Sequence, residues 1–277
     1  MADWRPMLNR RDNGFPRIMG VVNVTPDSFH AVSRSPDPQT AVTRAVKMAA
    51  DGAEWIDIGG ESTRPGAKPV GEHEELARVL PVVEAIRSEL PDICISIDTR
   101  RSEVARQSLE AGADMVNDVS SLSDPEMENV ILDWNCPICL MHMRGLPENM
   151  QDDPNYMDVV SEVRGVLSEA SGRLIDTGVE SSRIVVDPGI GFGKKLPHNL
   201  ALLSAGREVS PNDDMPLMWG VSRKSMFRDL LGRDASEERL PGTLGVAAIA
   251  AEKEVSIIRV HDVAEHSDLF GAMGALR

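Results

Sequence analysis

The stretch ICISIDTRRSEVARQSLEAGADMVNDV, residues 93–119, contains the pattern that decides the fold. A short apolar run at 93–98 leads through a polar turn into an amphipathic segment at 102–111, and a second apolar run follows at 115–119. Short runs rich in β-branched residues are typical of buried strands, and the longer amphipathic segment is typical of a helix. The same order of strand and helix recurs along the chain.

This pattern predicts eight strand and helix units. The expected strands cover 18–24, 54–58, 93–98, 115–119, 138–143, 184–187, 217–221 and 257–261. The expected helices cover 40–50, 73–90, 102–111, 125–134, 156–177, 200–207, 243–254 and 265–276. Eight such units favour a (β/α)8 TIM barrel over an open sheet. We therefore expect an α/β protein with one barrel domain over residues 1–277, in which 1–16 form an N-terminal extension and the active site lies at the C-terminal mouth.

The composition describes a globular protein and excludes several functional classes. The chain has 277 residues, of which 42% are hydrophobic, and this is enough to bury a large single core. Its formal net charge of −15 is opposite to what binding to nucleic acid through counterion release requires. We expect no nucleic-acid partner, and we expect any anionic ligand to be held by cations gathered locally.

The chain also gives no sign of a membrane or an oxidising compartment. Its longest apolar stretch, residues 242–251, is about half of the roughly 20 residues needed to cross a bilayer. The N-terminal residues are polar and lack the apolar core of a signal peptide. Three cysteines, Cys94, Cys136 and Cys139, are too few for a disulfide framework in a protein of this size. We expect a cytoplasmic protein without a membrane partner.

Polar side chains end every predicted strand, where the chemistry of such barrels gathers. Asp98 and Asp187 each close an apolar run, where a carboxylate is costly without a polar partner or a ligand, although a single Asp can also cap the following helix. Arg259 and His261 are two residues apart and therefore share one face of the last strand, whereas Val260 faces the helices. The other strand ends carry Asn23, Asp57, Asn117, Asp118, His142, Arg144 and the residues 222–225.

Three motifs invite other interpretations, which the sequence does not favour. The Gly-rich stretch 187–194 fails as a phosphate loop, because Pro188 and Lys195 stand where Gly and Ser or Thr are required, and it predicts a tight turn that approaches a flat ligand. The CxxC at 136–139 runs into a strand rather than opening a helix, which favours ordinary buried cysteines. The histidines form no HxxxH or HxH pair that would suggest zinc, and His73 and His266 are expected on helix surfaces.

Several of these stretches together resemble one known family. They are MGVVNVTPDSF (19–29), DIGGESTRPGA (57–67), SIDT (96–99), ND (117–118), CLMHMRG (139–145), DPGIGFGK (187–194), SRKSM (222–226) and IRVHDV (258–263). In this order, and over nearly the whole chain, they resemble dihydropteroate synthase of folate biosynthesis. The resemblance implies a transferase that joins 6-hydroxymethyl-7,8-dihydropterin diphosphate to p-aminobenzoate. The products are 7,8-dihydropteroate and pyrophosphate, and the mechanism is SN1-like.

The resemblance also implies roles for individual residues. It assigns catalysis to four of them, among which Asp98 stabilises the cation that forms as pyrophosphate leaves. It implies Mg2+ as a cofactor, with Asn23 as a ligand. The catalytic residues are Asp98, Lys224, Arg259 and His261; the pterin contacts Asp98, Asn117, Met141, Asp187, Gly191 and Lys224; the diphosphate contacts Asn23, Thr63, Arg64, Arg259 and His261; and p-aminobenzoate contacts Phe29, Thr63, Pro65, Phe192, Arg223 and Ser225.

One departure and two alternatives remain beside this reading. Residues 30–38, HAVSRSPDP, replace the short Gly-rich stretch that is usual after this first motif, which suggests weak use of p-aminobenzoate or use of another nucleophile. The alternatives are the methyltetrahydrofolate-binding barrel of corrinoid-linked methyltransferases and a non-catalytic pterin-binding paralogue. The motifs at 62–65, 222–225 and 259–261 favour the synthase over the methyltransferase domain. A homodimer and action as a sulfonamide target are implied by the family alone.

Overall fold

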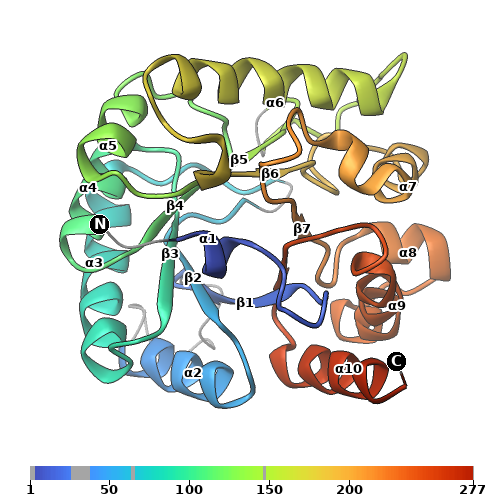
Figure 1. Ribbon diagram of the computed structural model, residues 1–277, viewed down its shortest axis with the longest axis horizontal. Helices are drawn as coiled ribbons and strands as arrows, with labels where there is room; N and C mark the ends of the chain where they lie inside the picture. The colour runs from blue at the N-terminus through green and yellow to red at the C-terminus, as the bar shows by residue number, and fades with distance from the viewer. Residues whose placement is uncertain (1–3, 26–37, 64–65, 146–147, 277) are drawn as a thin grey trace.

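The computed structural model describes residues 4–25, 38–63, 66–145 and 148–276. Within these residues, eight parallel strands lie side by side in the order β6-β5-β4-β3-β2-β1-β8-β7 (Figure 1). A single bridge between Val186 of β6 and Leu217, next to β7, brings the two ends of the sheet together as a barrel. The strands are β1 (Arg17–Asn23), β2 (Trp55–Gly59), β3 (Cys94–Asp98), β4 (Met115–Asp118), β5 (Ile138–Met141), β6 (Ile184–Asp187), β7 (Met218–Gly220) and β8 (Ile257–Val260).

Helices surround this barrel on its outside (Figure 1). The eight predicted helices are present, with bounds that differ from the prediction by a few residues at most ends. Two short helices that the sequence did not reveal are α1, before the first strand, and α8, after the seventh. The described helices are α1 (Arg5–Leu8), α2 (Pro38–Ala50), α3 (Glu72–Glu89), α4 (Ser102–Glu110), α5 (Met127–Trp134), α6 (Val159–Asp176), α7 (Leu196–Ala205), α8 (Met226–Leu231), α9 (Leu240–Ala250) and α10 (Val263–Ala275), with 3-10 turns at Ser181–Arg183, Gly206–Val209 and Ser236–Arg239.

The alternation of side chains along each strand divides the barrel into an apolar floor and a polar mouth. Trp55, Cys94 and Val185 point inward near the strand starts and belong to one buried apolar cluster. Two residues further along, the same inward face carries Asp57, Ser96 and Asp187, because side chains alternate between the two faces of a strand. A larger apolar cluster fills the space between the outer face of the sheet and the helices.

The described part of the predicted N-terminal extension covers the floor of the barrel. Leu8 is buried in the apolar cluster of the floor, and Trp55 donates its indole N–H to the carbonyl oxygen of Met7 at 2.9 Å. Trp4 and Met7 pack against the apolar cluster of the floor. These residues therefore close the end of the barrel that lies away from the mouth.

Several smaller predictions can be checked in the same structure. Cys136 and Cys139 are buried, unpaired thiols, as expected. His73 is exposed, but the prediction that His266 lies on a surface is wrong, because α10 turns this side chain onto the body of the protein. Its Nδ1 lies 2.6 Å from the carbonyl oxygen of Asp262. Along the described chain, no helix combines the length and the apolar character that a membrane span needs.

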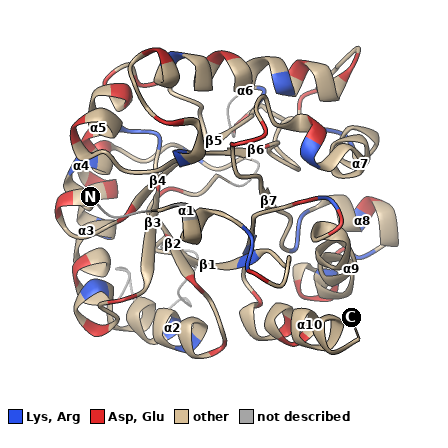
Figure 2. Ribbon diagram, in the orientation of Figure 1, with Lys and Arg blue, Asp and Glu red and all other residues tan. Residues whose placement is uncertain are grey.

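Acidic and basic residues are interspersed along the outer helices (Figure 2). Because the charges of the described helices are mixed in this view, we look for cations that could hold an anionic ligand at the ends of the strands.

Candidate active site

The carboxyl ends of the strands place a group of buried polar side chains in the mouth of the barrel. Asp57, Asp98, Asn117 and Asp187 come from four different strands, and all four are buried. Each points inward because it lies two or four residues after an inward apolar residue on the same strand, and side chains alternate between the two faces. Asp118 is next to Asn117 and therefore lies on the other face of β4. Its carboxylate accepts hydrogen bonds from the backbone N–H groups of Ser120 and Leu122 in the turn after the strand.

Arg259 of β8 connects two of these acids. Its Nε donates to Oδ2 of Asp57 at 2.6 Å, and its Nη2 donates to Oδ2 of Asp98 at 2.8 Å. Asn117 donates from Nδ2 to the same Asp57 oxygen at 3.3 Å. Burial opposes the charged guanidinium, but the carboxylates of Asp57 and Asp98 outweigh it and raise the pKa of Arg259. The guanidinium therefore stays charged and holds three strands together.

The cluster is not saturated by its own hydrogen bonds. Within the described chain, Oδ1 of Asp57, Oγ of Ser96 and Oδ1 of Asn117 are buried without a partner. Burial raises the pKa of Asp98 to about 7, although Arg259 acts in the opposite direction. Buried polar atoms normally find partners, and strongly shifted carboxyl pKa values gather at functional sites. The mouth of the barrel is therefore the best candidate for a ligand site.

Lys224 and Asp187 belong to the same site, because each interacts electrostatically with Arg259. Oδ1 of Asp187 accepts the backbone N–H of Gly189 at 2.7 Å, and burial raises the pKa of this carboxyl. Burial lowers the pKa of Lys224 to about 8. Its Nζ lies 3.8 Å from the ring centroid of Phe192, and a Cβ at Gly191 would stand 3.3 Å from its Cδ. A carboxyl group and an ammonium that influence each other in this way suit the donor and acceptor edge of a flat heterocycle.

The other predicted residues lie around the same mouth. Met141 is buried at the end of β5, paired in register with Asp187. Nδ1 of His261 lies 2.9 Å from Oγ of Ser222. Asn23 is half-buried at the end of β1, and Thr63 borders a narrow cleft that also contains Asp98.

The predicted p-aminobenzoate residues are only partly placed. Phe192 and Ser225 are half-buried beside Lys224. Arg223 is held at a φ of +54° and forms a bidentate ion pair with Asp262, with Nε to Oδ2 at 2.9 Å. Phe29, Arg64 and Pro65 lie outside the described residues, as do 26–37 of the atypical first loop.

Two features of the site were missed by sequence reasoning. One is Lys194, which the family motif contains but to which no role was assigned, and which is buried against His142. The other is Arg101, whose guanidinium donates to Glu61 at 2.5 Å, to Glu75 and to the carbonyl of Val70. Arg101 thus joins both ends of the segment that carries Thr63. Lys194 stands in the motif 187–194, but its contact with His142, 52 residues away, could not be found from the sequence, and neither could the contact of Arg101 with Glu61, 40 residues away.

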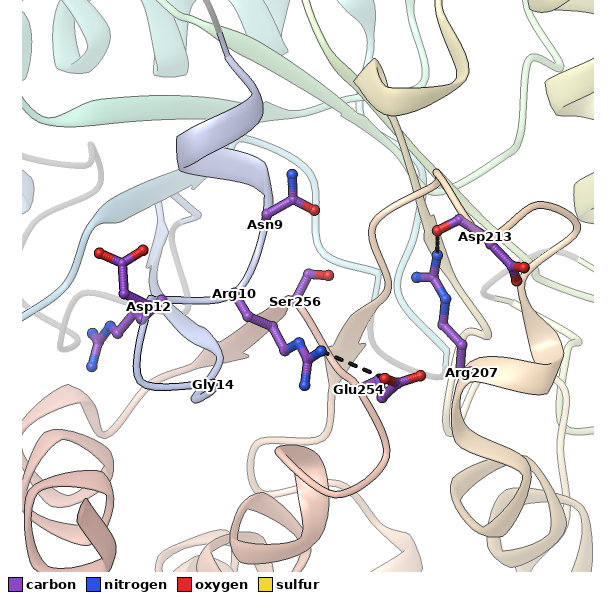
Figure 3. A pocket seen from close by; sticks show the side chains of 9 residues that line it. Asn9, Arg10, Asp12, Gly14, Arg207, Asp213, Glu254 and Ser256 are labelled. Carbon is purple, nitrogen blue, oxygen red and sulfur yellow. Dashed lines mark hydrogen bonds and ion pairs between the residues drawn. The ribbon is translucent and has the colours of Figure 1, made fainter. Parts of the chain in front are cut away.

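A second depression lies at the opposite end of the barrel, where the strands begin (Figure 3). Its volume is about 670 Å3, and one ion pair joins two of its charged side chains. Arg10 and Glu254 form an ion pair at 3.5 Å, and Arg207 donates to backbone carbonyls that include the one of Asp213. In barrels of this class the chemistry sits at the other end, so this depression is no candidate for the active site.

Comparison with known proteins relates nearly the whole chain to one family, the family that the motifs also indicate. The family model described as pterin binding enzyme matches residues 19–261. Dihydropteroate synthase of Escherichia coli is 46% identical over 254 residues, which is 92% of this chain and 89% of that protein. The crystal structure of Yersinia pestis dihydropteroate synthase with a sulfonamide drug complex is 41% identical, with a TM-score of 0.89 over 96% of both chains. The Burkholderia cenocepacia enzyme complexed with 7,8-dihydropteroate is 42% identical, with a TM-score of 0.85 over 95% of this chain and 91% of that one.

Proposed function

The chain belongs to the pterin-binding enzyme family, as a dihydropteroate synthase, and from this premise we propose how its barrel mouth works. The enzyme transfers the 7,8-dihydropterin-6-ylmethyl group from its diphosphate to p-aminobenzoate. The C–O bond to the diphosphate breaks, a C–N bond to the amine forms, and the amine loses a proton. Pyrophosphate and 7,8-dihydropteroate are the products.

The buried cluster around Arg259 is the observation that carries this proposal. Its unpaired Asp57 and Asn117 oxygens and the carboxyl groups of Asp98 and Asp187 can accept hydrogen bonds from the ring N–H and amino groups of a pterin. Lys224 can donate to the ring carbonyl. A wrong ligand would leave these buried groups unpaired, which costs about 1–3 kcal/mol for each group. The site therefore selects a pterin edge.

Arg259 lies where it can serve both parts of the first substrate. Its Nε and Nη2 are engaged by Asp57 and Asp98, whereas Nη1 has no partner among the described residues. We propose that Nη1 binds the diphosphate together with His261, Asn23 and Thr63. The chain's net negative charge is thereby offset at the place where the anion must bind.

Asp98 acts on the reacting group through its charge. As pyrophosphate leaves, positive charge develops on the pterin methylene and its ring. An ionised Asp98 stabilises this charge more strongly in the transition state than in the ground state, and such differential stabilisation accelerates a reaction. The aniline nitrogen then attacks the cation, so the chain needs no Ser, Cys or His nucleophile.

We propose Mg2+ as the metal cofactor, with Asn23 as its protein ligand. The amide oxygen of Asn23 is a hard donor, and its side chain is half-buried at the end of β1. The described residues contain no group of three His, Cys, Asp or Glu that could hold an ion by itself. This agrees with Mg2+, which keeps several waters and is commonly bound by one or two protein oxygens and substrate phosphates. When bound, the ion would neutralise charge on the leaving diphosphate.

We further propose a homodimer and a cytoplasmic location. Leu230 and Leu231 of α8 and Ile249 of α9 are exposed, and these two helices are neighbours in the fold (Figure 1). A contact between two copies would cover these side chains, and sedimentation of the purified protein tests it. Three buried, unpaired cysteines support a reducing compartment.

Release of pyrophosphate tests the reaction itself. The protein is mixed with 6-hydroxymethyl-7,8-dihydropterin diphosphate and Mg2+, with and without p-aminobenzoate. We expect pyrophosphate release that depends on the amine. Binding without release would identify a non-catalytic paralogue, and release without a requirement for p-aminobenzoate would show that another nucleophile is used.

A further inference from the structure

Lys194 is a buried lysine whose partners are all uncharged. The residue is only 3% exposed, and no described carboxylate forms an ion pair with its ammonium group. Nζ lies 2.8 Å from Nδ1 of His142, 3.3 Å from the carbonyl oxygen of His142 and 3.0 Å from the carbonyl oxygen of Phe192. An ammonium has three N–H donors, and here each donor meets one acceptor.

The environment of Lys194 makes this arrangement costly. Burial lowers the pKa of Lys194 to about 7, and burial lowers the pKa of His142 to about 3. His142 is therefore neutral, and its Nδ1 can accept a hydrogen bond from the ammonium. The charge of Asp187 opposes this shift, but no ion pair joins the two side chains. A buried amine without an ion pair is costly, so we look for its role in what its three acceptors hold in place.

These acceptors belong to two loops that meet at the mouth of the barrel. His142 directly follows β5, and Phe192 lies in the loop between β6 and α7. The loops touch at Gly189, which has a φ of +66° and where a Cβ would collide with the carbonyl oxygen of His142. Lys194 thus ties the two loops together beside this contact.

Two further side chains hold the same loop. The carbonyl of Gly191 accepts from Nε2 of Gln151 at 2.7 Å, and the carbonyl of Gly193 accepts from the hydroxyl of Tyr156 at 2.8 Å. Together with Lys194, they engage the carbonyls of three consecutive residues, 191–193. With its backbone held on both sides, Phe192 keeps its ring 3.8 Å from Nζ of Lys224.

We propose that Lys194 is a positioning residue that fixes Phe192 beside Lys224, and so sets the affinity of the site for the aromatic amine. Gln151 and Tyr156 act as supporting donors. The inference rests on the proposed function, in which Phe192 lines the p-aminobenzoate subsite and Lys224 holds the pterin. Small displacements of such a wall weaken binding, because a subsite depends on the residues that support it.

Lys194→Met tests the proposal, because methionine keeps most of the side chain and removes all three donors. We expect the KM for p-aminobenzoate to rise about tenfold, which corresponds to about 1.4 kcal/mol, while the KM for the pterin diphosphate stays within about twofold. The matched control is Lys195→Met. Lys195 is the next residue, but it is exposed and pairs with Asp153 at 2.6 Å, so we expect no change in either KM.

Tyr156→Phe and Phe192→Ala complete the set. Tyr156→Phe removes only the hydroxyl that holds Gly193, and we expect a rise of about threefold in the same KM. If Lys194→Met does not fold, this variant and Gln151→Ala decide the question by the same KM. Phe192→Ala reports on the subsite itself, and we expect it to raise the KM for p-aminobenzoate.

The outcomes separate the positioning role from the assignment of the subsite. A raised KM in Phe192→Ala with an unchanged KM in Lys194→Met overturns the positioning role alone. Unchanged values in both variants overturn the subsite and the inference with it. Equal rises in both KM values in Lys194→Met would show a general structural role and would also overturn the inference. A wild-type enzyme that makes no dihydropteroate in the same assay contradicts the proposed function instead.

Discussion

Both ends of the barrel carry charged side chains, but these are arranged in opposite ways. At the mouth, Asp57, Asp98 and Arg259 are packed into the interior, and some of their buried neighbours keep unpaired oxygens. At the floor, Arg10 and Glu254 pair with each other at an open surface. The floor has the wide depression of about 670 Å3, whereas the cleft beside Asp98 is narrow.

The difference teaches that the cost of burial identifies a site better than the size of a hollow. Charges at an open surface are solvated whether or not a ligand comes, so they need no function to explain them. Buried polar atoms without partners are a cost to folding that a ligand can repay by hydrogen bonding. Substitutions at the two ends should therefore have very different effects.

Arg259→Met should have the largest effect. It removes the charge between Asp57 and Asp98 and the donor proposed for the diphosphate. We expect kcat/KM to fall about 1,000-fold or more and the free energy of unfolding to fall by about 2–3 kcal/mol, somewhat less than for a fully buried pair because the side chain is 21% exposed. Steady-state kinetics and urea unfolding measure the two effects. Affinity for a diphosphate-free pterin should change less than affinity for the diphosphate, and the reverse order would contradict our placement of Arg259.

Asp187→Ala and Lys224→Ala should have the next largest effect, on pterin binding. Each removes one partner of the pterin edge, and we expect the Kd of a diphosphate-free dihydropterin to rise about 100-fold. Isothermal titration calorimetry measures this. Asp213→Ala at the floor, where the carboxylate is exposed, is the matched control and should bind as the wild type does. An unchanged Kd in Asp187→Ala would show that the pterin does not contact Asp187.

The dependence of the reaction rate on pH should show an effect of intermediate size that arises at the mouth of the barrel. Burial raises the pKa of Asp98 to about 7 and lowers the pKa of Lys224 to about 8. If ionised Asp98 and charged Lys224 are the active forms, the rate should rise with pH through the first value and fall above the second, by about tenfold per pH unit on each limb. Asp98→Asn should lose the acidic limb, and a profile that keeps this limb would exclude Asp98 as its source.

The same titration should be visible in stability. The pKa of Asp98 is raised from 3.8 to about 7, so between these pH values the folded chain binds a proton that the unfolded chain does not. The contribution of this group to the free energy of unfolding is therefore fully present below pH 3.8 and is lost as the pH rises through about 7. Urea unfolding of the wild type and of Asp98→Asn across this range should differ in that slope. Equal slopes would show that Asp98 titrates normally.

Arg10→Ala should have the smallest effect. The side chains of Arg10 and Glu254 are 36% and 56% exposed, and exposed ion pairs contribute little. We expect a loss of at most about 0.5 kcal/mol in the free energy of unfolding and unchanged kinetics with both substrates. A clear loss of activity would show that the floor takes part in function and would break the contrast drawn here.

Most of the fold could be predicted from the sequence because the deciding signals are local. The run 93–98, the amphipathic segment 102–111 and the run 115–119 correspond to β3, α4 and β4 within one or two residues. The short helices α1 and α8 could not be found in this way. They are four and six residues long, and helices of this length owe their stability to packing rather than to their own sequence. His266 was placed wrongly for a related reason, since its burial depends on how α10 packs.

The site was predicted in part. The alternation along β8 placed Arg259 inward and Val260 outward, as the structure has them. It could not reveal that Arg259 would meet Asp57, which lies 202 residues away, or that Lys194 would meet His142, which lies 52 residues away. Such pairs depend on which strands and loops become neighbours.

The sequence by itself therefore determined the order of strands and helices, the faces on which Arg259 and Val260 lie, and the family. The tertiary structure decided which of these residues are buried, which pair with one another, and which polar atoms remain without a partner. The physical reason is the distance along the chain over which each effect acts. Side-chain alternation and helix periodicity follow from the geometry of a few neighbouring residues. Desolvation and charge pairing depend on atoms that only the closed barrel brings together.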